Sequence, residues 1–96
     1  MQTIIEYVTF ETDPKHSNEA VKQAIYQTDA ILAQLDGFIK RDLAQRADAT
    51  WVEVVYWRDM KSAEEGLATF IKDTRSAELF AMIIQSSVKI DYSNQF

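Results

Sequence analysis

The segment that most restricts the fold of this chain is residues 51–57, which read Trp-Val-Glu-Val-Val-Tyr-Trp. β-Branched and aromatic residues are enriched in strands, so this run is the strongest β-strand pattern in the sequence. Because side chains alternate along a strand, the run has two mainly apolar faces. They carry Val52, Val54 and Tyr56 on one side and Trp51, Val55 and Trp57 on the other. A sheet built on this strand needs cover on both faces, and helices on one side leave the other face for a second sheet.

Residues 3–11 have the same character and predict a second central strand. Ile5, Tyr7 and Thr9 would share one face, and neither face is properly polar. The sequence Thr-Asp-Pro at 12–14 ends the strand, because proline removes a backbone donor and Asp-Pro favours a turn.

The clearest helical pattern begins at Ser17 or Asn18, either of which can cap a helix, and runs to about Asp36. One apolar stripe follows it at helical spacing, formed by Val21, Ile25, Thr28, Leu32 and Leu35. Gly37 stands where a left-handed residue commonly ends a helix.

Two further strands and a second helical region complete the chain. Strands are predicted over residues 38–44 and 86–92, the second with alternating apolar and polar side chains. Ser62 and Glu65 form a capping-box pattern at the start of a helix. That helix is interrupted at residues 73–75, and Ser76 is expected to cap a second short helix.

The predicted order β-α-β-β-α-β is that of the ferredoxin-like α+β fold, with a four-stranded antiparallel sheet. Residues 1–96 are expected to form one domain. An exposed second sheet face would be an apolar patch of the size that normally marks an interface. The pattern therefore predicts a side-by-side homodimer formed through the apolar sheet faces.

Composition excludes several classes of function. The formal charge of −5 and the scattered Lys and Arg argue against nucleic acid or an anionic membrane as partner. Without cysteine, the chain has no disulfide, thiolate metal site or Cys nucleophile. The first six residues lack the features of a signal peptide, and no apolar run approaches the ~20 residues of a membrane-spanning helix. We therefore expect a cytoplasmic protein.

Three stretches carry a resemblance that spans nearly the whole chain. They are Ile-Ile-Glu-Tyr-Val-Thr-Phe at 4–10, Gly-Phe-Ile at 37–39, and Val-Val-Tyr-Trp at 54–57 followed by Ser-Ala-Glu-Glu at 62–65. Together they resemble the antibiotic biosynthesis monooxygenase-like families of the dimeric α/β-barrel superfamily. The resemblance implies a barrel dimer with a ligand cavity between sheet and helices in each protomer. It also implies cofactor-free oxidation of a phenol or quinol, so neither cofactor nor metal is expected.

Glu6 and Glu53 are the carboxylates of interest, because each lies among apolar residues on a predicted central strand. A half-buried glutamate has a raised pKa and can act as a general base. The alternative is a structural salt bridge with Lys40 or Arg41, or a salt bridge across the dimer.

His16 is the only histidine, which excludes a histidine dyad and a multi-histidine metal site within one chain. It is either a solvated loop residue or a base that reaches the cavity mouth. The haem-degrading relatives use an axial histidine in the second helical region. Residues 62–84 contain none here, which disfavours haem chemistry.

Aromatic side chains could line the cavity and stack on a planar ligand, although at strand spacing they more often pack the core or an interface. The candidates for substrate binding are Tyr7, Trp51, Tyr56, Trp57, Phe70 and Phe80. The sequence leaves open which sheet face holds the cavity, and hence which of them meet.

Three functions follow from these observations. The first is a cofactor-independent monooxygenase with Glu6, Glu53 or His16 as base. The second is a dimer that binds a small aromatic ligand, or another partner, without catalysis. The third is an isomerase acting on a small acid, whose cationic pocket only Lys40, Arg41 and Arg58 could supply.

Overall fold

The computed structural model describes residues 3–96 of the chain. The strands are β1 (Ile4–Phe10), β2 (Phe38–Gln45), β3 (Trp51–Trp57) and β4 (Lys89–Asn94). The helices are α1 (Asn18–Gln27), α2 (Asp29–Leu32), α3 (Met60–Lys72) and α4 (Ala77–Met82). Single 3₁₀ turns lie at Thr74–Ser76 and Gln85–Ser87.

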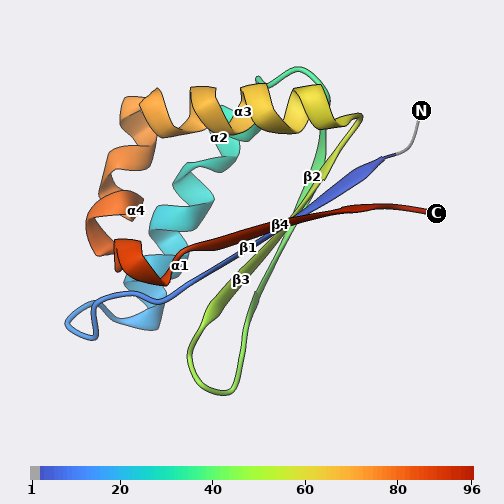
Figure 1. Cartoon of the computed structure of the whole chain (residues 1–96). Coiled ribbons are helices and arrows are strands. Elements are labelled where there is room, and N and C mark those ends of the chain that lie inside the picture. The colour runs from blue at the N-terminus through green and yellow to red at the C-terminus, as the bar shows by residue number, and fades with distance from the viewer. Residues whose placement is uncertain (1–2) are drawn as a thin grey trace.

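The four strands form one antiparallel sheet in the order β2-β3-β1-β4. All the helices lie on one side of this sheet, as Figure 1 shows. The predicted ferredoxin-like α+β fold is therefore confirmed. The structure places β3 and β1 at the centre of the sheet, as the apolar character of both strands predicted.

The first helical region differs from the single helix expected up to Asp36. It breaks at Thr28 into α1 and the single turn α2. The hydroxyl and the backbone N–H of Thr28 both donate to the carbonyl of Ile25, which draws the chain out of the regular helical path. Gly37 has a φ of +82°, the left-handed conformation that its position predicted.

The predicted capping box at Ser62 and Glu65 is wrong. The helix α3 begins three residues earlier, and Asp59 is its N-cap, with Oδ1 accepting the backbone N–H of Ser62 at 2.8 Å. Aspartate caps as well as serine does, so the earlier residue takes the position. Ser62 instead packs closely against Gly37. A Cβ added to Gly37 would lie 2.2 Å from the Ser62 Oγ.

Two boundaries in the C-terminal part also differ from expectation. Ser76 precedes α4 without capping it, because its hydroxyl donates to the carbonyls of Phe70 and Asp73 at the end of α3. The last strand begins at Lys89, three residues later than predicted, since Gln85–Ser87 forms a 3₁₀ turn. The predicted alternation holds within β4, where Ile90 and Tyr92 are half-buried between exposed neighbours.

The core between sheet and helices consists of two hydrophobic clusters. The first packs the helices α1 and α4 against the sheet and includes Phe10, Trp51 and Leu79. The second lies under α3 and contains Trp57 and Val55. A Cβ added to Gly66 of α3 would lie 2.3 Å from the Trp57 ring, so the missing side chain lets the helix approach the indole.

The opposite sheet face carries no helix of the described residues (Figure 1). Its central strands present Tyr7, Val54 and Tyr56, and the Tyr7 side chain is 37% exposed. Lys40 of β2 lies over the Tyr56 ring, with Nζ 4.5 Å from the ring centre. No helix in residues 3–96 is long and apolar enough to cross a membrane.

Candidate functional site

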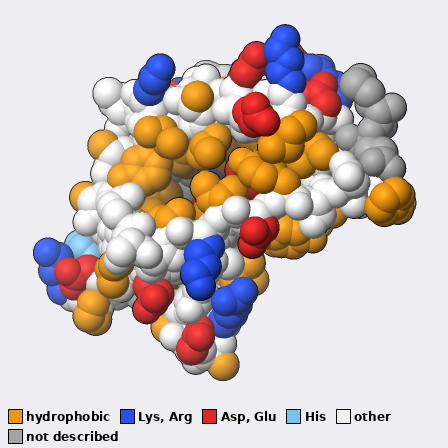
Figure 2. All heavy atoms as spheres, viewed as in Figure 1, with side chains coloured by type: hydrophobic (Ala, Val, Ile, Leu, Met, Phe, Trp, Pro, Cys, Tyr) orange, Lys and Arg blue, Asp and Glu red, His pale blue; other side chains and the backbone are white. Residues whose placement is uncertain are grey.

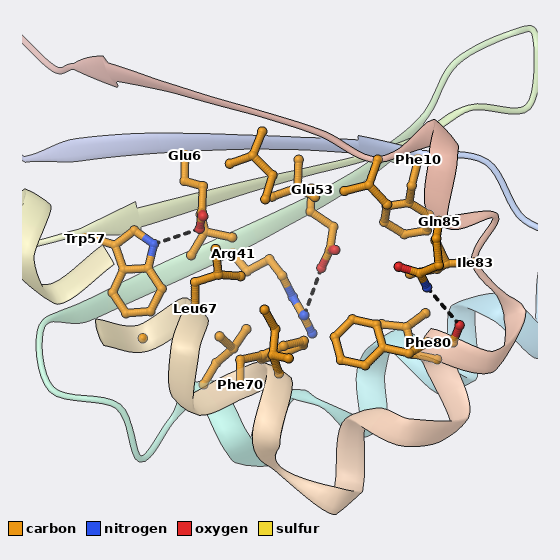
Figure 3. Close-up of a pocket in the computed structure, with 18 residues that line it drawn as sticks. Glu6, Phe10, Arg41, Glu53, Trp57, Leu67, Phe70, Phe80, Ile83 and Gln85 are labelled. Carbon is orange, nitrogen blue, oxygen red and sulfur yellow. Dashed lines mark hydrogen bonds and ion pairs between the residues drawn. The ribbon is translucent and has the colours of Figure 1, made fainter. Parts of the chain in front are cut away.

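A cavity of about 310 Å³ lies between the sheet and the helices α3 and α4. Figure 2 shows hydrophobic side chains gathered around the corresponding hollow. Most of the lining is apolar: Val8, Phe10, Leu32, Val55, Trp57, Leu67, Phe70, Ile71, Leu79, Phe80, Ile83, Val88 and Ile90. The charged side chains that line it are Glu6, Arg41 and Glu53 (Figure 3). Such an apolar cavity with a few polar groups is typical of a small-molecule site.

The Glu6 carboxylate is held at the sheet side of the cavity by two neutral donors. Its Oε1 accepts the indole Nε1–H of Trp57 at 3.0 Å, as Figure 3 shows, and its Oε2 accepts the Tyr92 hydroxyl at 3.2 Å. The strand register brings both donors close to Glu6 in space, because Tyr92 is directly opposite Glu6 on β4 and Trp57 is diagonal to it on β3. Two oxygens have about four lone-pair sites, so the carboxylate keeps acceptor capacity for a ligand.

Burial raises the pKa of Glu6 above its ordinary value of 4.5, because water cannot solvate the charged form. The hydrogen bonds from Trp57 and Tyr92 oppose that increase. The pKa of Tyr92 is raised to about 12 by burial first and then by the nearby Glu6 carboxylate. The tyrosine therefore stays protonated and acts as the donor.

Glu53 has a different environment, because it forms an ion pair. The guanidinium of Arg41 donates from Nη1 to its Oε1 at 2.9 Å, and the Arg41 side chain is 4% exposed. Burial raises the pKa of Glu53 and the Arg41 charge opposes this increase. The predicted alternative of a salt bridge from β2 thus exists at Glu53, whereas both donors to Glu6 within residues 3–96 are neutral.

The break between α1 and α2 holds Arg41 in place. Its guanidinium donates to the Thr28 hydroxyl at 2.8 Å and to the Ile25 carbonyl at 2.9 Å. It also pairs with Asp29. A cation at this position is favourable because the carbonyls at the end of a helix carry partial negative charge. The break in the helix therefore fixes the cation beside the cavity.

The described residues 3–96 contain no group of three or more His, Asp or Glu side chains arranged to hold a metal ion. What the site does offer is a carboxylate of raised pKa in an apolar cavity, next to an arginine–glutamate pair. Two carboxylates whose environments differ can take different roles, one as proton acceptor and one as fixed charge.

The structure brings five of the sequence-predicted site residues together at the cavity: Glu6, Glu53, Trp57, Phe70 and Phe80. The rings of Phe70 and Phe80 meet edge to face, with centroids 5.9 Å apart.

The other predicted residues lie elsewhere. Trp51 is on the same sheet face but lies in the first core cluster, and Tyr7 and Tyr56 project from the opposite face. His16 is in the loop before α1 and does not line the cavity. Of the three cations considered for an isomerase, only Arg41 reaches the cavity.

Sequence reasoning missed Tyr92 as a partner of Glu6 and Thr28 as a support of Arg41. The alternation of β4 placed Tyr92 on one face with Val88 and Ile90, which was a usable signal for the face. That Tyr92 lies directly opposite Glu6 follows from the register between β1 and β4, which cannot be predicted from one sequence.

No family model matches the sequence, and no curated protein matches it significantly. Solved structures do match. SnoaB from Streptomyces nogalater, a cofactor-independent oxygenase, has a TM-score of 0.79 at 16% identity, covering 100% of this chain and 95% of that chain. A candidate antibiotic biosynthesis monooxygenase from Bordetella bronchiseptica has a TM-score of 0.79 at 13% identity, with 100% and 99% covered. Another from Nitrosomonas europaea has a TM-score of 0.78 at 16% identity, with 99% and 91% covered. The predicted resemblance is confirmed at the level of the fold.

Proposed function

We propose that this protein is a cofactor-independent monooxygenase that binds a small aromatic, phenolic or quinol substrate in the sheet–helix cavity, with Glu6 as general base. The observation that carries the proposal is the position of the Glu6 carboxylate. It lines an apolar cavity, is 3% exposed, and receives its hydrogen bonds from the neutral donors Trp57 and Tyr92. A general base works best when its pKa lies near the working pH, and burial shifts Glu6 in that direction.

Anthrone illustrates the chemistry that such a site would support. Glu6 removes one proton from the methylene carbon, and the resulting electron-rich anion reacts with O2. One oxygen atom becomes the new carbonyl oxygen and the other leaves as water, so anthrone and O2 give anthraquinone and water. The substrate supplies all the electrons. The cavity's share is to orient the substrate and exclude bulk water.

Glu6 is preferred over the other candidate bases for geometric reasons. Glu53 already accepts a charge-assisted hydrogen bond from Arg41, so one of its oxygens is occupied by a cation that opposes the increase in pKa caused by burial. His16 does not line the cavity. In this proposal the Arg41–Glu53 pair is a fixed charge arrangement, and Trp57, Phe70 and Phe80 contact the substrate rings.

Oxygen uptake by the metal-stripped protein tests the proposal. The panel contains anthrone, naphthalene-1,4-diol and hydroquinone, each measured against its spontaneous oxidation and against heat-denatured protein. Uptake above both controls, with one atom from ¹⁸O2 in the anthraquinone formed from anthrone, is the expected result. No uptake with any compound contradicts the oxygenase. A rise in melting temperature without uptake would instead favour the second candidate, a protein that binds such ligands without turnover.

We further propose that the protein is a homodimer through the uncovered sheet face. That face presents Tyr7, Val54 and Tyr56 in the centre of the sheet, and helices of the described chain cover only the other face. Packing two such faces together would remove the apolar patch from water. Sedimentation at micromolar concentration should give a dimer that the substitution Val54→Arg converts to a folded monomer. A wild-type monomer at that concentration would contradict the proposal.

A further inference from the structure

The two oxygens of Glu6 have partners of different chemistry. The indole N–H of Trp57, on Oε1, is a donor only and does not exchange a proton with a carboxylic acid. The hydroxyl of Tyr92, on Oε2, is both donor and acceptor. Only the Oε2 side can therefore pass a proton onward through a hydrogen bond that the protein already contains.

The Tyr92 side of Glu6 leads away from the cavity. Glu6 lines the cavity, whereas Tyr92 does not. Tyr92 belongs to β4, which is an edge strand, and it is partly exposed while Glu6 is 3% exposed. The hydrogen bond thus connects a buried carboxylate with a side chain that solvent reaches.

We propose that Tyr92 is the proton exit of Glu6, connecting the cavity carboxylate to solvent at the β4 edge. After Glu6 has taken a proton from the substrate, its Oε2–H donates that proton to the Tyr92 oxygen while the hydroxyl releases its own proton to water. Glu6 returns to the carboxylate, Tyr92 returns to the neutral phenol, and one hydronium ion forms. The peroxide anion of the substrate takes one proton back from solvent water as its O–O bond breaks, so the overall reaction releases no net proton. No tyrosinate forms, which agrees with the raised pKa of this phenol. The inference rests on the proposed role of Glu6 as base.

Two further carboxylates act on the Glu6–Tyr92 pair. Glu53 faces Glu6 from β3, and its negative charge is partly offset by Arg41. Glu64 of α3 acts electrostatically on Tyr92 from outside the cavity, and it is exposed. Its negative charge raises the pKa of Tyr92 and so helps to keep this phenol neutral.

The first test measures proton exchange at Glu6 without any turnover. The ¹³C resonance of the Glu6 carboxyl is followed through its titration in wild type and in Tyr92→Phe, which keeps the ring and removes the hydroxyl. We expect the exchange between protonated and ionised Glu6 to slow by about tenfold or more in Tyr92→Phe, on the scale of positioned proton transfer. Tyr26→Phe, on the exposed surface of α1, is the matched control and should exchange as wild type does. Equal exchange rates in Tyr92→Phe and wild type would overturn the relay.

The second test uses anthrone oxidation and a small proton carrier. Tyr92→Phe should lower kcat with little change in KM, and added imidazole should restore kcat in this variant while leaving wild type unaffected. A loss of kcat that imidazole does not restore, with a normal melting temperature, would overturn the relay and leave Tyr92 a structural role. Failure of the proposed function can be distinguished from failure of the relay. If the proposed function fails, wild type takes up no oxygen, but the exchange measurement at Glu6 still shows whether protons pass through Tyr92.

Discussion

Trp57 and Glu6 lie 51 positions apart in the sequence, yet the indole Nε1–H of Trp57 donates a 3.0 Å hydrogen bond to Glu6 Oε1 beside the cavity. The antiparallel pairing of β1 with β3 places the two residues diagonally on the helix-facing side of the sheet. Gly66 of α3 leaves room for the indole above the sheet. The contact joins the core packing under α3 to the carboxylate that we propose as base.

Trp57→Phe should shift the pH dependence of the proposed reaction. The hydrogen bond from Trp57 lowers the pKa of Glu6, so its loss raises that pKa further. Because the base must be ionised, the acidic limb of the kcat/KM profile for anthrone should move to higher pH. An unshifted limb would show that this hydrogen bond does not tune the base.

Trp51→Phe is the matched control for that experiment. Trp51 is on the same face of β3 and buried, but its Nε1 has no hydrogen-bond partner among the described residues. The substitution removes similar volume without removing a hydrogen bond to a carboxylate. We expect a lower melting temperature and an unchanged acidic limb.

Glu6→Gln should change how stability depends on pH. Since the pKa of Glu6 is higher in the folded than in the unfolded chain, the folded state binds more protons between the two values. That contribution is fully present below the ordinary value of 4.5 and is lost as pH rises through the folded pKa. Urea unfolding should therefore show Glu6→Gln gaining stability relative to wild type as pH rises above 4.5. A difference that is constant with pH would contradict the raised pKa.

Arg41→Met should destabilise the fold by about 3–5 kcal/mol, because it leaves the buried Glu53 without its charged partner. The free energy of unfolding in urea measures the loss. Arg41→Met combined with Glu53→Leu removes both charges, and should recover a large part of it. A double variant as unstable as the sum of the two single variants would mean that the pair is not coupled.

Gly66→Ala should destabilise the protein, although alanine ordinarily favours a helix over glycine by about 1 kcal/mol. The added Cβ would lie 2.3 Å from the Trp57 ring, so α3 or the indole must move, at a cost of about 1–3 kcal/mol. Thermal melts measure the loss of stability, and tryptophan fluorescence measures the displacement of the indole. Thr69→Ala on the exposed side of α3 is the control. A more stable Gly66→Ala protein would show that the contact is loose.

The sequence predicted the sheet well because its patterns are local. The bounds of β3 agree with the prediction at both ends, since residues 51–57 are strongly β-forming and lie between polar segments. Helix starts were less predictable, because Asp59 and Ser62 are both good N-caps and tertiary contacts decide between them. The contact between Arg41 and the break at Thr28 joins two separate elements, so a local pattern does not predict it.

The candidate site was predictable in its residue types but not in its geometry. Glu6 and Glu53 were evident as carboxylates within apolar strands. Both faces of β1 and β3 are apolar, however, so the sequence could not say which face holds the cavity. Tyr7 and Tyr56 were therefore grouped with Phe70 and Phe80, from which the sheet separates them. The link from Glu6 to Tyr92 depends on strand register, which follows from the packed sheet.

The most direct test of the central claim, that Glu6 is the base of a cofactor-independent oxygenase, is anthrone-dependent oxygen uptake by metal-stripped Glu6→Gln. Glu78→Gln, on the exposed surface of α4, is the matched control. We predict that Glu6→Gln lowers kcat/KM by about 10²-fold or more while its sedimentation stays like that of wild type and its melting temperature does not fall. Uptake by Glu6→Gln at the wild-type rate would contradict the account.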